Sequence, residues 1–250
     1  MSIGSGYDQS LTTLSPDGRV FQVEYACKAV DNAGTAVGLC CKDGVVLGLE
    51  KLLISKMLVK GTNRAIHHVA KHIGMATAGL KADGRALANE AQGEASEYLD
   101  MYGSPIPAKL MAERFAGYVH TYTLYYYARA YGCATLMAVV DEDGPALWAI
   151  EADGECFKYY GYAVGKAKQQ AKTMISALDL ETLTCREAVV EIAKIINTCH
   201  DELKDKQFEL EMSWICEETG NVHKYVPAEL IAEATAAAKA AMDSDSEDDA

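Results

Sequence analysis

Several features that would point to a membrane or a secreted protein are missing from this 250-residue sequence. No run reaches the roughly 18 consecutive apolar residues that a membrane-spanning helix requires. The first ten residues, MSIGSGYDQS, lack the basic and apolar regions of a secretory signal. The sequence therefore predicts neither membrane association nor secretion.

Positive charge is also scarce. Lysine and arginine number 23 against 36 aspartates and glutamates, which gives a formal net charge of −13. Such a chain repels phosphate groups, so nucleic acid is not expected as a direct partner. Five of the acidic residues lie in the segment 243–249, yet the remaining chain is acidic without them.

The eight cysteines contain no CxxC pair. Most lie among apolar neighbours, where a free thiol behaves as a small hydrophobic group. A disulfide framework is typical of short secreted chains, so the pattern predicts free thiols in a reducing compartment. It predicts no structural metal site.

Apolar periodicity and turn residues predict an alternation of helices and paired strands. Asp-Gly pairs between apolar runs indicate hairpins, so the sheets should be antiparallel. Helix pairs between the strand groups should cover the sheet faces. The expected helices are Arg19–Asn32, Leu80–Met101, Ala108–Tyr127, Lys166–Leu178, one starting after Thr184, and Ala228–Met242; the expected strands are Thr35–Cys41, Val45–Leu49, Ile66–Lys71, Ile73–Ala78, Cys133–Val140, Ala146–Glu151, one after Gly154, and Gln207–Ile215.

The expected fold is therefore α/β (α+β): a layered sandwich of antiparallel sheets and helices, with no linker to divide it. Residues 1–14 are small and polar, and they predict a mobile N-terminal arm. Residues 15–242 should form a single domain, and residues 243–250 a disordered acidic tail.

The most specific motif is LSPDGRVFQVEYA, which spans Leu14–Ala26. It closely resembles the N-terminal signature of 20S proteasome α-type subunits and departs from it only at Leu14, where that family has an aromatic residue. The segments GTAVGLCCKDGVVLGLEK at 34–51 and HIGMATAGL at 72–80 also resemble that family. KDKQFELEMSWI at 204–215 and the acidic C-terminus most resemble its type-3 branch.

The resemblance implies a four-layer αββα sandwich, which is the N-terminal nucleophile hydrolase fold. It also implies a non-catalytic subunit in a heptameric α ring stacked on a catalytic β ring. Such a ring admits substrates for ubiquitin-dependent and ubiquitin-independent degradation, docks the C-terminal tails of activators, and works in the cytoplasm and nucleus.

The resemblance also implies roles for individual residues. Tyr7, Asp8, Pro16 and Tyr25 match the family's gate cluster, and the alternative for Tyr25 is simple packing of a helix face. Gln9 replaces the family's usual arginine, so the gate contact that this arginine makes is not predicted for this chain.

The helix that carries Arg19, Gln22 and Glu24 should pack against the next α-type chain. In the family, a pocket lysine usually pairs with the carboxylate of an activator tail. Alignment places Ala65 at that position, and Arg64 beside it is the candidate substitute. A weak or altered activator pocket is therefore expected.

Ser244 and Ser246 each precede an acidic residue by three positions, which suits phosphorylation by an acidophilic kinase. The alternative is an unmodified, solvated tail.

A catalytic alternative begins from Gly34-Thr35, which resembles the cleavage junction of the related β subunits. Cleavage there would free a threonine α-amine that can act as a base. In the β subunits a nearby lysine tunes the nucleophile, and an aspartate holds that lysine. Here residues 65–68 contain no lysine, and Glu50 or Lys51 stands where the aspartate would be. A third alternative is a free-standing acidic binding module with the same fold.

Two other chemical motifs fail on spacing. Gly161–Lys166 is one residue short of a phosphate-binding loop, and Ala167 cannot supply its hydroxyl. His67, His68 and His72 could suggest a metal site, but no cysteine or carboxylate completes a ligand set. His67 and His68 are neighbours on an expected strand, so their side chains should point to opposite faces. No cofactor or metal is predicted.

Overall fold

The computed structural model describes residues 6–53, 55–59, 61–200 and 207–248, with side chains described up to residue 240. Two five-stranded antiparallel sheets form its centre. The first has the order β10-β9-β2-β1-β8, with β1 Ala36–Cys41, β2 Gly44–Leu52, β8 Gly161–Val164, β9 Phe208–Cys216 and β10 Lys224–Tyr225. The second has the order β3-β4-β5-β6-β7, with β3 Ile66–Ala70, β4 Ile73–Gly79, β5 Cys133–Asp141, β6 Gly144–Ile150 and β7 Cys156–Tyr159.

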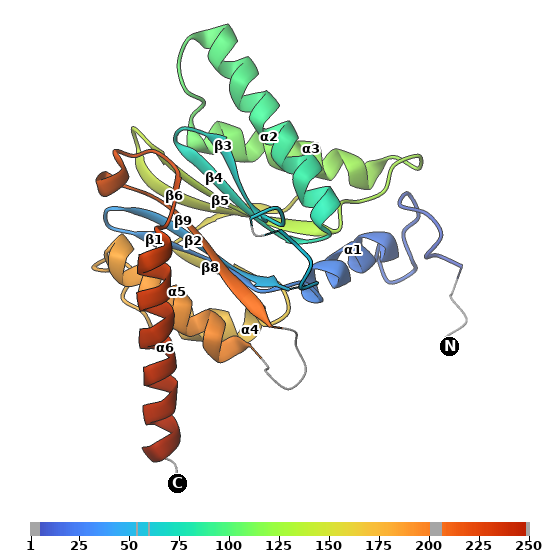
Figure 1. The fold of residues 1–250 in the computed structure, drawn as a ribbon. Coiled ribbons are helices and arrows are strands. Elements are labelled where there is room, and N and C mark those ends of the chain that lie inside the picture. The colour runs from blue at the N-terminus through green and yellow to red at the C-terminus, as the bar shows by residue number, and fades with distance from the viewer. Residues whose placement is uncertain (1–5, 54, 60, 201–206, 249–250) are drawn as a thin grey trace.

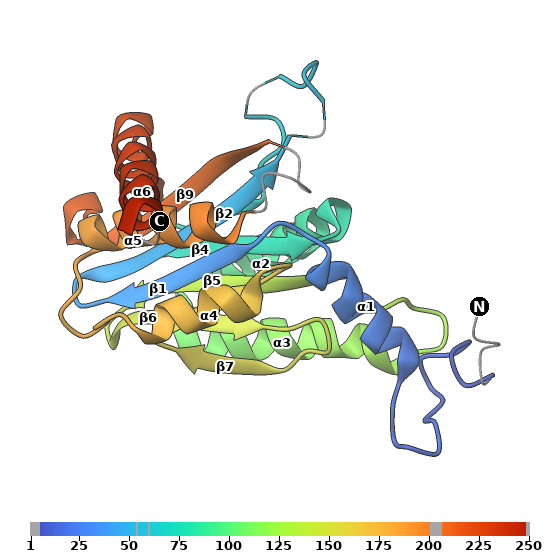
Figure 2. The same cartoon turned by 90° about the horizontal axis from the view of Figure 1, so that it is seen from below.

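Helices cover both outer faces of the stacked sheets (Figure 1). Helices α2 (Lys81–Tyr102) and α3 (Ala108–Leu124) lie on the second sheet. Helices α4 (Lys168–Ser176), α5 (Cys185–Cys199) and α6 (Ala228–Asp248) lie on the side of the first sheet. Helix α1 (Phe21–Asp31) lies at one end of the sandwich, beside the N-terminal arm (Figure 2). The predicted four-layer αββα sandwich is confirmed.

The burial of β2 shows how the sequence specifies these layers. Val45, Leu47 and Leu49 face the core between the sheets, whereas Val46 faces the core under the helices. Alternate side chains of a strand point to opposite faces, so a strand covered on both sides is apolar throughout. Gly48 allows α5 to approach closely, because a Cβ there would lie 2.2 Å from Ile192 Cγ2.

The sequence predicted a helix after Thr184, and a capping box fixes the start of this helix, α5. The Thr184 hydroxyl accepts the Glu187 N–H, and the Glu187 carboxylate accepts the Thr184 N–H at 2.9 Å. Two N–H groups that the helix leaves unpaired are thereby satisfied.

Replacing Thr184 with alanine should therefore lower the free energy of unfolding by about 1 kcal/mol, the usual cost of losing an N-cap. Thr184→Ser keeps the hydroxyl and should stay close to the parent chain. Urea unfolding followed by circular dichroism compares the three proteins. Equal midpoints for the alanine variant and the parent would show that the cap contributes nothing.

Several boundaries differ from the sequence prediction. Helix α1 begins at Phe21 rather than Arg19, because Val20 has an extended backbone. Helix α3 ends at Leu124, since Tyr125 is also extended. Strands β8 and β10 were not predicted. Both are short edge strands: β8 pairs with β1, far earlier in the chain, whereas β10 pairs with the preceding strand β9 and is only two residues long.

The C-terminal segment also differs. Helix α6 continues through Asp248 instead of ending at Met242, so residues 243–248 are helical where a disordered tail was expected. After Pro227 this part of the chain contains neither glycine nor proline and is rich in alanine, the best helix former.

Among the helices that the structure describes, none is long and apolar enough to cross a bilayer.

Candidate subunit-contact surface and docking site

The segment before α1 is a tight turn. Gly18 N–H donates to the Ser15 carbonyl at 2.9 Å, and Gly18 has a φ of 74°, which glycine adopts without strain. The Ser15 hydroxyl accepts the Arg19 N–H at 3.1 Å. Pro16 is exposed on the turn. These contacts fix the path of the chain into the helix.

The predicted interface residues lie at the start of α1 and just before it: Arg19 is exposed, and Gln22 and Glu24 are half-buried. Arg19 forms a two-pronged ion pair with Glu24 and also lies over the Phe21 ring, 5.2 Å from its centroid. The hydrogen bonds from Arg19 lower the pKa of the Glu24 carboxyl. An exposed pair of this kind contributes little to the stability of the chain, so it is available for contact with a neighbour.

The structure joins the N-terminal arm to α1 through Gln22, whose side-chain amide donates to the main-chain carbonyl of Asp8. Leu11 is buried against the core between the sheets. In residues 6–14, which the structure describes, the arm therefore contacts the body; the predicted mobility of segment 1–14 is not tested.

The four predicted gate residues are not brought together within this chain. Tyr7 and Tyr25 are 39% and 42% exposed, and Pro16 is exposed. No hydrogen bond or ring contact joins Tyr7, Asp8, Pro16 and Tyr25 in the described structure. Tyr25 stacks on Phe21 and lies under the Lys28 ammonium, on an open face of the helix. This exposure disfavours simple core packing for Tyr25.

Thr35 occupies a closed environment. It is 1% exposed, and its nitrogen is a main-chain amide that donates to Glu50 Oε2 at 3.0 Å. The Thr35 hydroxyl accepts the Ala167 N–H at 3.3 Å. A catalytic N-terminal threonine needs a free α-amine. With α1 packed in front of it, Thr35 has none.

Glu50 connects this region to the end of α5. Its Oε1 lies 2.7 Å from His200 Nδ1, and both side chains are 7% exposed. Both carboxylate oxygens are therefore occupied, one by Thr35 and one by His200. Glu50 is arranged as a structural anchor rather than as a group that holds a catalytic lysine.

Arg64, the predicted activator-pocket residue, points elsewhere. Its guanidinium lies over the Tyr225 ring at 4.1 Å from the centroid, and the Tyr225 hydroxyl donates to the Ile66 carbonyl at 2.9 Å. Arg64 lines an open hollow of about 160 Å³ beside Glu211. It does not line the neighbouring cavity that contains Ala65.

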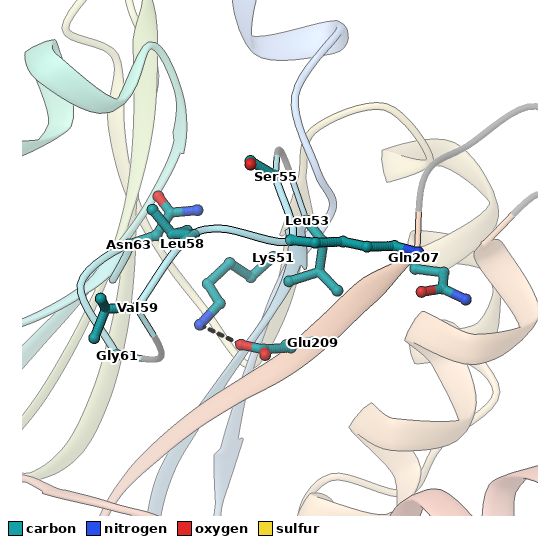
Figure 3. A pocket seen from close by; sticks show the side chains of 10 residues that line it. Lys51, Leu53, Ser55, Leu58, Val59, Gly61, Asn63, Gln207 and Glu209 are labelled. Atoms are coloured by element: carbon teal, nitrogen blue, oxygen red, sulfur yellow. Dashed lines mark ion pairs between the residues drawn. The ribbon is translucent and has the colours of Figure 1, made fainter.

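That neighbouring cavity, called cavity 2 here, measures about 170 Å³ and is lined by Gly34, Lys51, Ala65 and Lys81 among others. A larger cavity of about 470 Å³, cavity 1, adjoins it and shares Lys51 (Figure 3). Sequence reasoning did not select Lys51 or Lys81 as cavity residues, because only the fold brings β2 and the start of α2 to one cavity.

The remaining candidate residues lie neither at the start of α1 nor in the two cavities. In the segment that was compared with a phosphate-binding loop, Gly161–Val164 forms strand β8. Nowhere in the described chain do three or more His, Cys, Asp or Glu side chains form a group that could hold a metal. Ser244 and Ser246 lie within the helical span of α6, but their side chains are outside the described residues.

Comparison with known proteins identifies the family. Residues 30–215 match the family model of the proteasome subunit, and residues 7–29 match the model of the N-terminal signature of A-type proteasome subunits. The proteasome α type-3 subunit of Oryza sativa subsp. japonica is 57% identical over 242 residues, and that of Spinacia oleracea 56% identical, with 97% of each chain covered in both cases. The protein of the same name from Drosophila melanogaster is 45% identical, covering 99% of this chain and 98% of the relative.

The layered fold, the closed Thr35 and the signature before α1 define an α-type proteasome subunit. The chain belongs to the proteasome subunit family, and its relatives of high identity are α type-3 subunits. In that role it assembles with other proteasome subunits and serves protein degradation.

Proposed function

We propose that this chain is a non-catalytic ring and gate subunit of the 20S core, and the environment of Thr35 carries the proposal. The Thr35 nitrogen is a buried amide bonded to Glu50, and a packed helix precedes it. Lys51 is paired with Glu209 at 2.7 Å, so it is not held beside the threonine hydroxyl. Threonine catalysis requires a free α-amine, a lysine beside the hydroxyl and an aspartate that holds the lysine, and none of the three is present here.

The partners that we propose are two neighbouring α subunits in a heptameric ring, a β ring below, and the C-terminal tails of activators. The start of α1, with Arg19, Gln22 and Glu24, contacts the adjacent α-type chain. Tyr7, Asp8, Pro16 and Tyr25 then complete gate contacts across that boundary. Their lack of mutual contacts within one chain fits a cluster that is assembled from two chains.

We further propose a place in ubiquitin-dependent and ubiquitin-independent degradation, in the cytoplasm and nucleus. All eight cysteines are free thiols, which fits a reducing compartment. Ser244 and Ser246 remain proposed phosphorylation sites. Cell fractionation tests the location, and mass spectrometry of the native chain tests the modification.

Purification of the native complex through a C-terminal tag tests ring membership. Native mass spectrometry should find the chain in an assembly with six other α-type subunits and with β subunits. A chain that runs only as a monomer or a homodimer would contradict the proposal and support a free-standing binding module instead.

Removal of the Arg19–Glu24 pair tests the contact surface. Arg19→Ala should change the melting temperature of the isolated chain by less than about 2 °C, because the pair is exposed. We expect the same variant to enter rings at a markedly lower yield, since its neighbour loses a charged contact. Lys109→Ala on α3 is the control, because Lys109 is exposed and far along the chain from α1. Equal ring yields for the two variants would exclude Arg19 from the interface.

A further inference from the structure

Three tyrosine side chains meet where α3 ends and the chain returns to the second sheet. Tyr118 and Tyr122 lie one turn apart on α3, and Tyr131 precedes β5. The ring centroids of Tyr122 and Tyr131 are 4.7 Å apart, and those of Tyr118 and Tyr122 are 5.1 Å apart. These are direct ring contacts, at the close end of the range for aromatic pairs. All three residues are half-buried, so the cluster keeps contact with solvent.

The three hydroxyl groups form one hydrogen-bonded group around Tyr118. Its oxygen lies 3.2 Å from that of Tyr122 and 3.3 Å from that of Tyr131. Burial raises the pKa of Tyr118 and of Tyr131, so these phenols stay protonated at neutral pH. A protonated phenol that loses an electron must also release its proton. A phenol oxygen both donates and accepts hydrogen bonds, so Tyr118 offers a path for the proton that Tyr122 or Tyr131 releases.

Two other close tyrosine pairs differ, because each has a cation over one of its rings. The Lys172 ammonium lies 3.7 Å from the centroid of Tyr162, and the Arg114 guanidinium lies 5.7 Å from the centroid of Tyr98. A positive charge on the ring face opposes the removal of an electron from that ring. In the part of the chain that the structure describes, no cation lies over the three rings at the end of α3. The two other pairs are Tyr159–Tyr162 and Tyr98–Tyr102.

We propose that Tyr122 and Tyr131 are a site of oxidative cross-linking, at which a haem peroxidase and hydrogen peroxide join the two rings as dityrosine. Each ring gives up one electron and its phenolic proton, and the two phenoxyl radicals couple through the ring carbons next to the C–O carbons. The hydrogen on each coupled carbon then moves to the oxygen, which restores both phenols. Hydrogen peroxide takes up the two electrons and two protons and becomes two molecules of water.

Such a bond ties the end of α3 to the chain before β5. It closes residues 123–130 into a small loop, and part of this segment lines a hollow of about 140 Å³ together with Leu11 of the N-terminal arm and Gln22 of α1. The cross-link therefore restricts a segment that lies against the arm. This site goes beyond the proposed function and does not depend on it, because the reaction needs only one folded chain.

Peptide mapping of the full-length chain tests the site after treatment with a haem peroxidase and hydrogen peroxide. Trypsin cuts after Arg129, so Tyr122 and Tyr131 fall in separate peptides, 115–129 and 130–158. In the monomeric fraction from a denaturing gel, mass spectrometry should find the two peptides joined, with their summed mass less two hydrogen atoms. A bond between Tyr125 and Tyr127 stays within peptide 115–129 and joins nothing.

The control for the reagent is N-acetyltyrosine, which should dimerise under the same conditions. If N-acetyltyrosine dimerises and the chain yields no joined peptide, the proposal is overturned.

Variants then locate the bond. Tyr122→Phe should abolish the joined peptide, because phenylalanine cannot form a phenoxyl radical. Tyr118→Phe keeps both reacting rings but removes the path for the proton, so it should lower the yield without abolishing it. Tyr160→Phe, at a tyrosine that is 72% exposed and outside the cluster, is the matched control and should react like the parent. Circular dichroism confirms that each variant is folded. A folded Tyr122→Phe chain that gives the joined peptide at the parental yield would place the bond at another tyrosine and overturn the proposal.

Discussion

Replacing Glu50 with alanine should lower the free energy of unfolding by about 3 kcal/mol. The carboxylate is buried and accepts the Thr35 N–H at 3.0 Å, and its other oxygen lies 2.7 Å from His200 Nδ1. Its removal leaves two buried polar groups without partners, and each such group costs about 1–3 kcal/mol. Urea unfolding at pH 7 measures the change.

Two further variants show what causes the loss. Glu50→Gln keeps an acceptor for Thr35 but removes the charge, so we expect an intermediate loss. Glu97→Ala changes an exposed glutamate on α2 and should stay within about 0.5 kcal/mol of the parent. If Glu50→Ala were as stable as Glu97→Ala, Glu50 would not be the structural anchor that we describe.

Acidification from pH 7 to pH 5 should remove about 2 kcal/mol of stability through His223 alone. His223 is 5% exposed, and its Nε2 has no hydrogen-bond partner. Burial lowers the pKa of His223 from 6.5 to about 4, and the nearby His68 contributes to this shift, with the two Nδ1 atoms 3.2 Å apart.

The sign follows from the two pKa values. Between pH 6.5 and 4 the unfolded chain binds the proton and the folded chain does not, so folding becomes less favourable as the pH falls. Each pH unit within this window costs about 1.4 kcal/mol. Above pH 6.5 the contribution of His223 is fully present.

His223→Leu removes this titration. The difference in unfolding free energy between pH 7 and pH 5 should then be smaller than in the parent by about 2 kcal/mol. His120→Leu, at an exposed histidine of α3, should keep the parent difference. An unchanged pH dependence in the His223 variant would show that His223 does not titrate as described.

Local signals predicted most of the framework. The apolar run of β2, the Asp-Gly hairpin between β1 and β2, and the helix start after Thr184 are each encoded within a few residues. The signature from Leu14 to Ala26 identified the family because it is long and without gaps, and the comparisons confirmed it.

The features that were missed depend on distant pairing. Strand β8 is short and pairs with β1, more than 100 residues earlier in the chain. The His68–His223 contact joins β3 to the loop before β10, and Lys51 of β2 and Lys81 of α2 line one cavity although they are 30 positions apart in the chain. The periodicity of a short segment does not predict contacts between residues that are far apart in the chain.

The direction of Arg64 was also beyond sequence reasoning. Proximity to Ala65 in the chain made Arg64 the candidate for the pocket cation. The structure instead places its guanidinium on the Tyr225 ring, where the aromatic face attracts a cation. Adjacent residues near the start of a strand point in different directions, so Arg64 does not line the cavity that Ala65 lines.

The intact mass of this chain, taken from the native complex, tests the central claim most directly. A non-catalytic α-type chain should keep residues 2–34, so that Thr35 stays a buried amide within a ring of seven α-type chains. A mature chain in the complex that begins at Thr35 would have a free threonine amine, and that result would contradict the account.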